Sequence, residues 1–139
     1  MAVVLDTSIV VALMRARDRD HERVRHFIET LDDDLVTSPL AVAEMDRVAT
    51  GLGPAFNRGL WDDLRSGAYA IRWWADAMVE TIAVVERHPE IGLTDASLVA
   101  LAARLRTDRI ATLDLDHFRS LTTPDGEAFV LLPADATDK

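Results

Sequence analysis

The hydrophobic positions of this chain alternate between short unbroken runs and longer stretches with helical spacing. Val3 to Leu5 form an apolar run typical of a strand that is covered on both faces. Four later runs predict further strands: Leu35–Thr37, Tyr69–Arg72, one that begins at Ile110, and Phe129–Leu132. Together these runs indicate a sheet of four to five strands.

Helical patterns separate the predicted strands. Asp20 is expected to cap a helix that carries an i, i+3, i+4, i+7 apolar stripe: Val24, Phe27, Ile28 and Leu31. Five other helices are expected: one to about Met14, Pro39 to about Thr50 with Ser38 as its cap, one to about Arg65, about Ala75 to Arg87, and one from Gly92 to Ala103 that is apolar nearly all round and should be buried. Strands that alternate with helices predict an α/β, three-layer fold with a central parallel sheet flanked by helices.

The length and composition favour one domain. The chain has 139 residues and no linker-like tract, so residues 1–133 are expected to form a single domain before a polar tail, 134–139. No apolar stretch approaches the ~20 residues that cross a bilayer, and no secretory leader is recognisable. We therefore expect a cytoplasmic protein without membrane contact. The absence of cysteine excludes disulfides, thiolate nucleophiles and cysteine zinc sites.

The charge balance narrows the range of functions. A formal charge of −9 argues against loose binding to nucleic acid, although it leaves room for a local basic patch. The only lysine is Lys139, which disfavours a catalytic lysine. Five arginines crowd the segment after the first strand and helix: Arg15, Arg17, Arg19, Arg23 and Arg25. This arginine cluster either contacts phosphate or forms a solvated helix face.

Two carboxylates directly follow predicted strands. Asp6 ends the first strand and precedes Thr7 and Ser8, and Asp114 follows Thr112 after a later strand. Because ligands of open parallel sheets bind at the carboxyl ends of the strands, we expect Asp6 and Asp114 to meet where the winding direction reverses. Taken alone, Asp6 is better explained as a helix cap, and only the similar arrangement at Asp114 favours a functional role.

Two further acids lie on predicted helices. Glu44 stands where an apolar residue is expected, since its neighbours on the helix surface are Leu40, Ala41 and Val48. A carboxylate buried there needs an arginine or a cation as its partner. Asp95 opens the apolar helix, where it or Thr94 could serve as a cap.

Four carboxylates in one site require a compensating cation, because each raises the proton affinity of the others. Mg²⁺ and Mn²⁺ accept such oxygen ligands. A bound divalent ion polarises a phosphoryl oxygen and aligns an attacking water. The acids therefore point to metal-dependent cleavage of a phosphodiester.

Four segments of this chain carry these acids: VVLDTS at 3–8, AE at 43–44, LTDA at 93–96 and ATLDLDHF at 111–118. They resemble the acidic motifs of the PIN domain, and specifically of the VapC toxins of bacterial toxin–antitoxin pairs. The likeness covers nearly the full chain, down to an LLP ending at 131–133. It implies a Mg²⁺- or Mn²⁺-dependent endoribonuclease that cleaves structured RNA, a tRNA or ribosomal RNA loop, and thereby inhibits translation.

The resemblance also implies roles for individual residues. The metal and the attacking water would be held by Asp6, Glu44, Asp95 and Asp114, with Ser8 and Thr112 as supporting hydroxyls and Asp116 as an auxiliary acid. Metal and the arginine cluster would neutralise the scissile phosphate. The implied partners are a second copy of the chain and a VapB antitoxin that blocks the metal site.

Other functions fit the sequence less well. A phosphatase of the haloacid dehalogenase type needs a second aspartate where Ser8 stands, and it needs a lysine, as a receiver domain also does. A catalytically inactive PIN-like module that binds RNA or protein is the main alternative, since the sequence does not show whether a metal is bound.

Overall fold

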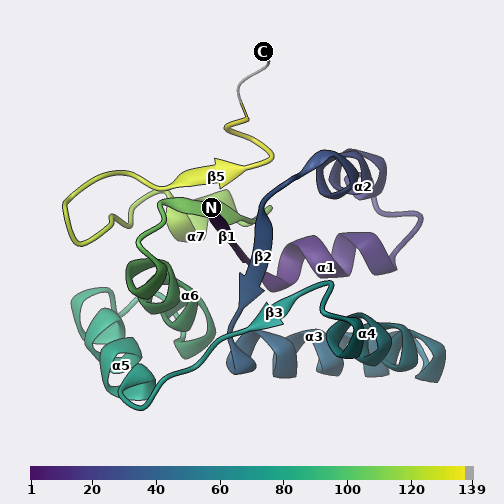
Figure 1. Ribbon diagram of the computed structural model, residues 1–139, viewed down its shortest axis with the longest axis horizontal. Coiled ribbons are helices and arrows are strands. Elements are labelled where there is room, and N and C mark those ends of the chain that lie inside the picture. Colours follow the sequence, from purple (N-terminus) through teal and green to yellow (C-terminus); the bar gives the residue numbers. More distant parts are fainter. Residues whose placement is uncertain (137–139) are drawn as a thin grey trace.

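Within residues 1–136, which the computed structural model describes, five parallel strands form one sheet in the order β3-β2-β1-β4-β5 (Figure 1). The strands are β1 Ala2–Leu5, β2 Asp34–Thr37, β3 Ala70–Ile71, β4 Arg109–Ala111 and β5 Val130–Leu132. This arrangement confirms the predicted α/β fold with a parallel central sheet.

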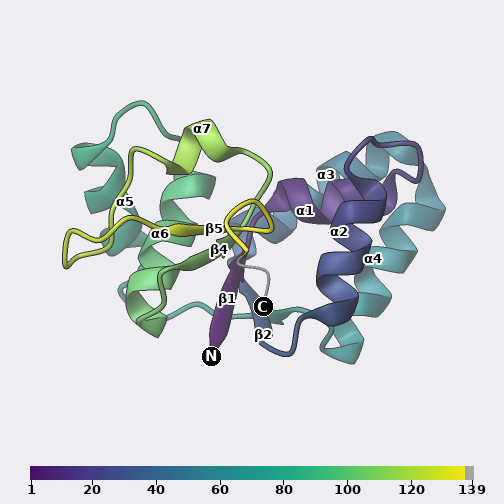
Figure 2. The ribbon, with the colours of Figure 1, turned by 90° about the horizontal axis from the view of Figure 1, so that it is seen from above.

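Seven helices accompany these strands within the same residues: α1 Thr7–Met14, α2 His21–Thr30, α3 Pro39–Leu52, α4 Pro54–Ser66, α5 Ala77–Arg87, α6 Leu93–Leu105 and α7 Leu115–Phe118. In Figure 2, α1 to α4 lie on one side of β1 and α5 to α7 lie on the other. The four-residue α7 was not predicted, because it is too short to show a helical repeat. None of the helices in residues 1–136 is long and apolar enough to cross a membrane.

The winding direction of the sheet reverses between β1 and β4. From β1 the chain builds outward through β2 to β3, then returns to the other edge of β1 as β4 and continues to β5. Leu5 pairs with Ala111, and the Asp6 backbone N–H donates to the Ala111 carbonyl over 2.9 Å. The carboxyl ends of these two strands therefore lie side by side, as the sequence predicted.

The core lies around β1 and α6. Val3, Val4 and Leu5 are fully buried, and every residue of Ala96–Ala102 in α6 is buried, which confirms the helix predicted to be buried. The third strand was predicted too long, since β3 has only two residues, both exposed at the edge of the sheet. Trp73 beside it is exposed, whereas Trp74 packs against the core.

The helix caps agree only in part with the sequence prediction. Ser38 caps α3 by accepting from the Ala41 N–H over 3.2 Å, and Pro39 takes the first helical position, as predicted. Asp20 stands at the start of α2, but its side chain caps nothing and pairs with arginines instead. The residue that precedes α6 is Gly92, so neither Thr94 nor Asp95 caps that helix. The capping explanation for Asp95 is therefore wrong, although this carboxylate does lie in the first turn of α6.

The start of the predicted polar tail, residues 134–136, is anchored to the rest of the fold. The Asp135 carboxylate accepts two hydrogen bonds from Arg119, at 2.6 and 2.7 Å, and one from the Leu131 N–H at 2.8 Å. Residues 134–136 are thus held against β5. The rest of the predicted tail, which includes Lys139, lies outside the described residues.

A polar clamp fixes α4 onto α3, the helix that carries Glu44. The buried amide of Asn57 donates to the Asp46 carbonyl at 3.2 Å, to its carboxylate at 2.9 Å and to the Thr50 hydroxyl at 3.0 Å. The Trp61 indole N–H donates to the same carboxylate oxygen over 2.8 Å. These contacts join α4 to the side of α3 that carries Asp46 and Thr50.

We expect Asn57→Ala to lower the free energy of unfolding by about 1–3 kcal/mol, because Asp46 and Thr50 lose a buried donor. Urea unfolding followed by circular dichroism measures this change. Arg58→Ala, at the exposed neighbouring position, should stay within about 0.5 kcal/mol of wild type. Equal stability of the two variants would show that the clamp adds nothing.

Candidate functional site

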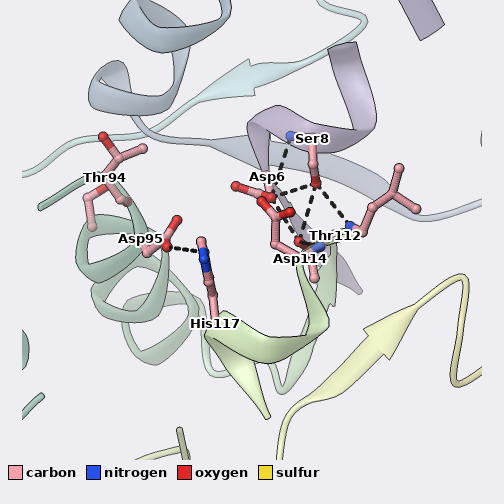
Figure 3. Close-up of polar contacts among 9 residues, drawn as sticks. Asp6, Ser8, Thr94, Asp95, Thr112, Asp114 and His117 are labelled. Carbon is pink, nitrogen blue, oxygen red and sulfur yellow. Dashed lines mark hydrogen bonds and ion pairs between the residues drawn. The ribbon is translucent and has the colours of Figure 1, made fainter. Parts of the chain in front are cut away.

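Asp6 is the most constrained acid of the structure. It follows β1, is only 2% exposed and occupies the N-cap position of α1. Its Oδ2 accepts hydrogen bonds from the Ser8 hydroxyl at 2.7 Å, the Thr112 hydroxyl at 2.8 Å and the Ser8 N–H at 3.4 Å (Figure 3). The capping explanation is thus correct but incomplete, since Thr112 belongs to a segment more than one hundred residues away.

The Ser8 and Thr112 hydroxyls cannot donate a further hydrogen bond while they donate to Asp6. Each has a single proton, which it gives to Asp6, and each accepts one backbone N–H: Ser8 from Leu113 at 2.9 Å and Thr112 from Asp114 at 3.0 Å. Within the described residues, Asp6 Oδ1 has no hydrogen bond. The network therefore orients the carboxylate through one oxygen and leaves the other for a ligand.

Asp95 and Asp114 lie within electrostatic reach of Asp6. Burial, followed by the negative charge of Asp6, raises the pKa of Asp95 to about 6, against the smaller opposing effect of His117. Desolvation and the charge of Asp6 likewise raise the pKa of Asp114 above its ordinary value, with a further contribution from Glu44. The four acids Asp6, Glu44, Asp95 and Asp114, here called the acid site, thus share one neighbourhood.

His117 is a member of this neighbourhood that the sequence did not reveal. Its Nδ1 lies 2.9 Å from Asp95 Oδ2, and its side chain is 57% exposed (Figure 3). The residue stands three positions after Asp114, the spacing of neighbours on a helix surface. That spacing would have been a usable signal had α7 been recognised.

Glu44 is half-buried, not fully buried as its apolar neighbours suggested. The buried face of α3 is centred on Ala41, Met45 and Ala49, and Glu44 lies at the edge of that face. No arginine forms an ion pair with Glu44 within residues 1–136. Of the two partners expected for this carboxylate, the described part of the chain therefore does not provide the arginine.

The acid site is open in this structure. Among the described residues, no three histidine, aspartate or glutamate side chains are grouped closely enough to hold a metal ion. Asp116 is exposed and lines a hollow of about 330 Å³ together with Asp114 and His117. The acids that were expected to converge therefore influence one another's pKa values, but their side chains do not surround a common point closely enough to coordinate one ion.

The donor chemistry of the acid site nevertheless fits a divalent cation. Its ligands are carboxylate oxygens, which Mg²⁺ and Mn²⁺ prefer. Asp6 and Asp95 each have one oxygen held by the protein and one without a hydrogen bond within residues 1–136. Burial and neighbouring acids raise the pKa values of Asp95 and Asp114, and no arginine within the described residues compensates for the negative charge of these acids.

The arginine cluster is largely neutralised by acids of its own segment. Arg19 and Arg23 pair with Asp20, and Arg25 pairs with the exposed Glu22 and Glu29. This pairing favours a solvated helix face for these three arginines. Two other members, Arg15 and Arg17, are exposed at the far end of α1, about 12 Å from its start at 1.5 Å per residue.

We expect Asp95→Asn to stabilise the metal-free protein by about 1–2 kcal/mol at pH 7.5 and to have little effect near pH 4. The pKa of Asp95 in the folded state, about 6, is above the ordinary 3.8, so the stability that its proton contributes is complete below pH 4 and is lost as the pH rises through 6. Urea unfolding in EDTA at both pH values measures the difference. A variant with the same advantage at pH 4 and 7.5 would contradict this explanation.

Known proteins share both the sequence and the fold of this chain. Residues 3–122 match the PIN domain family. The chain is 36% identical over 135 residues to Ribonuclease VapC26 of Mycobacterium tuberculosis, covering 94% of this chain and all of that protein. Its fold is similar to the crystal structure of VapC20 of Mycobacterium tuberculosis, described as a sarcin-ricin loop cleaving toxin, with a TM-score of 0.74, 18% identity, and 83% and 93% of the two chains covered.

A chain of a solved toxin–antitoxin complex has a similar fold. VapBC2 from Rickettsia felis, solved with a DNA fragment from its promoter, matches with a TM-score of 0.65 and 15% identity over 94% of this chain and 97% of the other. At these low identities the solved structures show the fold alone, whereas the family match and the closer relative carry the assignment. The chain therefore belongs to the PIN domain family, and within that family to the VapC ribonuclease toxins.

Proposed function

We propose that this chain is a Mg²⁺- or Mn²⁺-dependent endoribonuclease that cleaves structured RNA, a tRNA or ribosomal RNA loop, and thereby inhibits translation. The observation that carries the proposal is the acid site, where four carboxylates from distant segments are electrostatically coupled and no described basic side chain except His117 opposes them. The names of the relatives add support, since one is a ribonuclease and another cleaves the sarcin-ricin loop.

The residues that would hold the metal are Asp6, Glu44, Asp95 and Asp114. When bound there, a divalent ion would polarise the phosphoryl oxygen and lower the pKa of a water molecule. Ser8 and Thr112 prevent rotation of the Asp6 carboxylate, because both donate to the same oxygen. His117 holds one oxygen of Asp95 in the same manner.

Two protein partners accompany this function. A VapB-type antitoxin would block the acid site, and the solved VapBC complexes of similar fold support such a partner. A second copy of the chain would cover the exposed apolar side chains of α5, where Met78, Val79 and Ile82 are 40%, 69% and 45% exposed.

We expect purified protein, freed of antitoxin, to cut total RNA at discrete positions with Mg²⁺ and not with EDTA. Asp6→Asn and Glu44→Gln should each lower the cleavage rate at least about 100-fold, because metal ligands and their supports typically contribute 10- to 100-fold or more. Glu44→Gln should also melt at or above the wild-type temperature without metal, since it removes an uncompensated charge. Gel analysis of new RNA ends measures the cleavage.

The exposed Glu127→Gln is a matched control and should cut as wild type does. Wild-type behaviour of Asp6→Asn, or RNA binding without any cleavage, would instead indicate an inactive RNA-binding or protein-binding module. Marked destabilisation of metal-free Glu44→Gln would reveal a structural ion pair.

RNA binding should weaken steeply with salt, because a chain of charge −9 binds phosphate only through local arginines. We expect the double variant Arg15→Ala/Arg17→Ala to reduce the magnitude of the slope of log affinity against log salt by about 1. This is the change expected for the loss of one to two phosphate contacts, at ~0.7 per contact on single-stranded RNA. Arg25→Ala, whose guanidinium already pairs with two acids, should change the slope little. Fluorescence anisotropy in EDTA measures both, and a salt-independent affinity would remove the arginine cluster from the RNA interface.

A further inference from the structure

Ser97 is the one polar residue in the buried stretch Ala96–Ala102 of α6. Its side chain is fully buried, as is that of Ser38, the N-cap of α3. The two hydroxyl oxygens lie 2.7 Å apart, although the residues are separated by 59 positions in the sequence. A buried contact of two hydroxyls therefore joins α3 to α6.

The direction of this hydrogen bond follows from the other contacts of the two hydroxyls. Ser97 donates its single proton to the Thr94 carbonyl over 2.6 Å, so the proton between the two serines comes from Ser38. Ser38 in turn accepts from the Ala41 N–H. A continuous chain of hydrogen bonds thus runs from the first turn of α3 to the first turn of α6.

Both helices that this chain joins carry a member of the acid site. Thr94 directly precedes Asp95, and Glu44 lies six residues after Ser38 on α3. Nothing covalent holds the two acids at a defined separation, because they belong to different helices that approach each other only in the folded protein. The serine contact is the buried polar link between the two helix starts in the described structure.

We propose that Ser97 is a positioning residue, which sets the position of Asp95 relative to Glu44 by anchoring the first turn of α6 to the cap of α3. The proposal rests on the proposed metal-dependent function. Helix packing alone does not require a hydroxyl at this position, since alanine fills the neighbouring sites 96 and 100 and a buried hydrogen bond adds little net stability. The hydrogen bond instead fixes how the two helices are placed, because its distance and angle are satisfied only within a narrow range of helix separations.

The test is Ser97→Ala, measured by Mn²⁺ binding to the full chain through the electron paramagnetic resonance signal of free Mn²⁺. We expect affinity to weaken about tenfold, the lower end of what supporting residues contribute at metal sites. For RNA cleavage at saturating Mn²⁺, kcat should fall while KM stays unchanged, because RNA contacts are not altered. Thr81→Val is the matched control, since Thr81 is equally buried on α5 and its hydroxyl has no hydrogen-bond partner within residues 1–136.

A second variant guards against loss of folding. Ser97→Cys keeps the branching and the number of side-chain atoms but donates weakly, and the chain contains no other cysteine with which it could pair. If Ser97→Ala does not fold, Ser97→Cys should show the same weaker Mn²⁺ binding with a wild-type circular dichroism spectrum. The effects of Ser38→Ala and Ser97→Ala on Mn²⁺ affinity should also be non-additive, as expected for two partners of one contact.

The remaining outcomes separate the proposed role of Ser97 from the proposed nuclease function. Wild-type Mn²⁺ affinity in folded Ser97→Ala or Ser97→Cys, with RNA still cut by the wild-type chain, overturns the role of Ser97 and leaves the nuclease proposal intact. An equal loss of affinity in Thr81→Val would show a general packing effect and would also overturn it. Absence of Mn²⁺ binding by the wild-type chain would remove the metal site and, with it, the role of Ser97.

Discussion

The pairing of β1 with β4 is the constraint on which the acid site depends. It places the Asp6 backbone against Ala111, and it brings the Thr112 hydroxyl to the Asp6 carboxylate. Since the sheet reverses its winding at this pair, the loops that follow both strands open at the same place. Asp95 of α6 and Asp114, which directly precedes α7, are then brought to a carboxylate that is already oriented.

The same arrangement works against stability. Burial, and after it the repulsion between neighbouring acids, raises the pKa values of Asp95 and Asp114. The apolar core around β1 and α6 contributes stability that offsets this cost. A functional site that is locally unfavourable and supported by a rigid scaffold is common where a ligand supplies the missing charge.

The sequence could predict those features that depend on local pattern combined with the rules of parallel sheets. The adjacency of Asp6 and Asp114 followed from two strand ends and one winding rule, and the burial of α6 followed from its apolar surface. The pairing of Arg25 with Glu22 and Glu29 was also accessible, because the partners lie three and four residues away on one helix. The short length of β3 and the existence of the four-residue α7 were beyond reach, since neither element is long enough to show a period.

By itself, therefore, the sequence determined the order of the elements, the parallel sheet, the strand-end acids and the family resemblance, all of which are encoded by residues within a few turns of each other. Only the tertiary structure decided which oxygen of Asp6 is held, that Glu44 lies at the edge of the buried face of α3, that His117 reaches Asp95, and that Ser38 meets Ser97. The physical reason is that a hydrogen bond depends on the separation and direction of two groups. When those groups lie tens of residues apart, their separation is set by the packing of whole helices and strands, which no local pattern specifies.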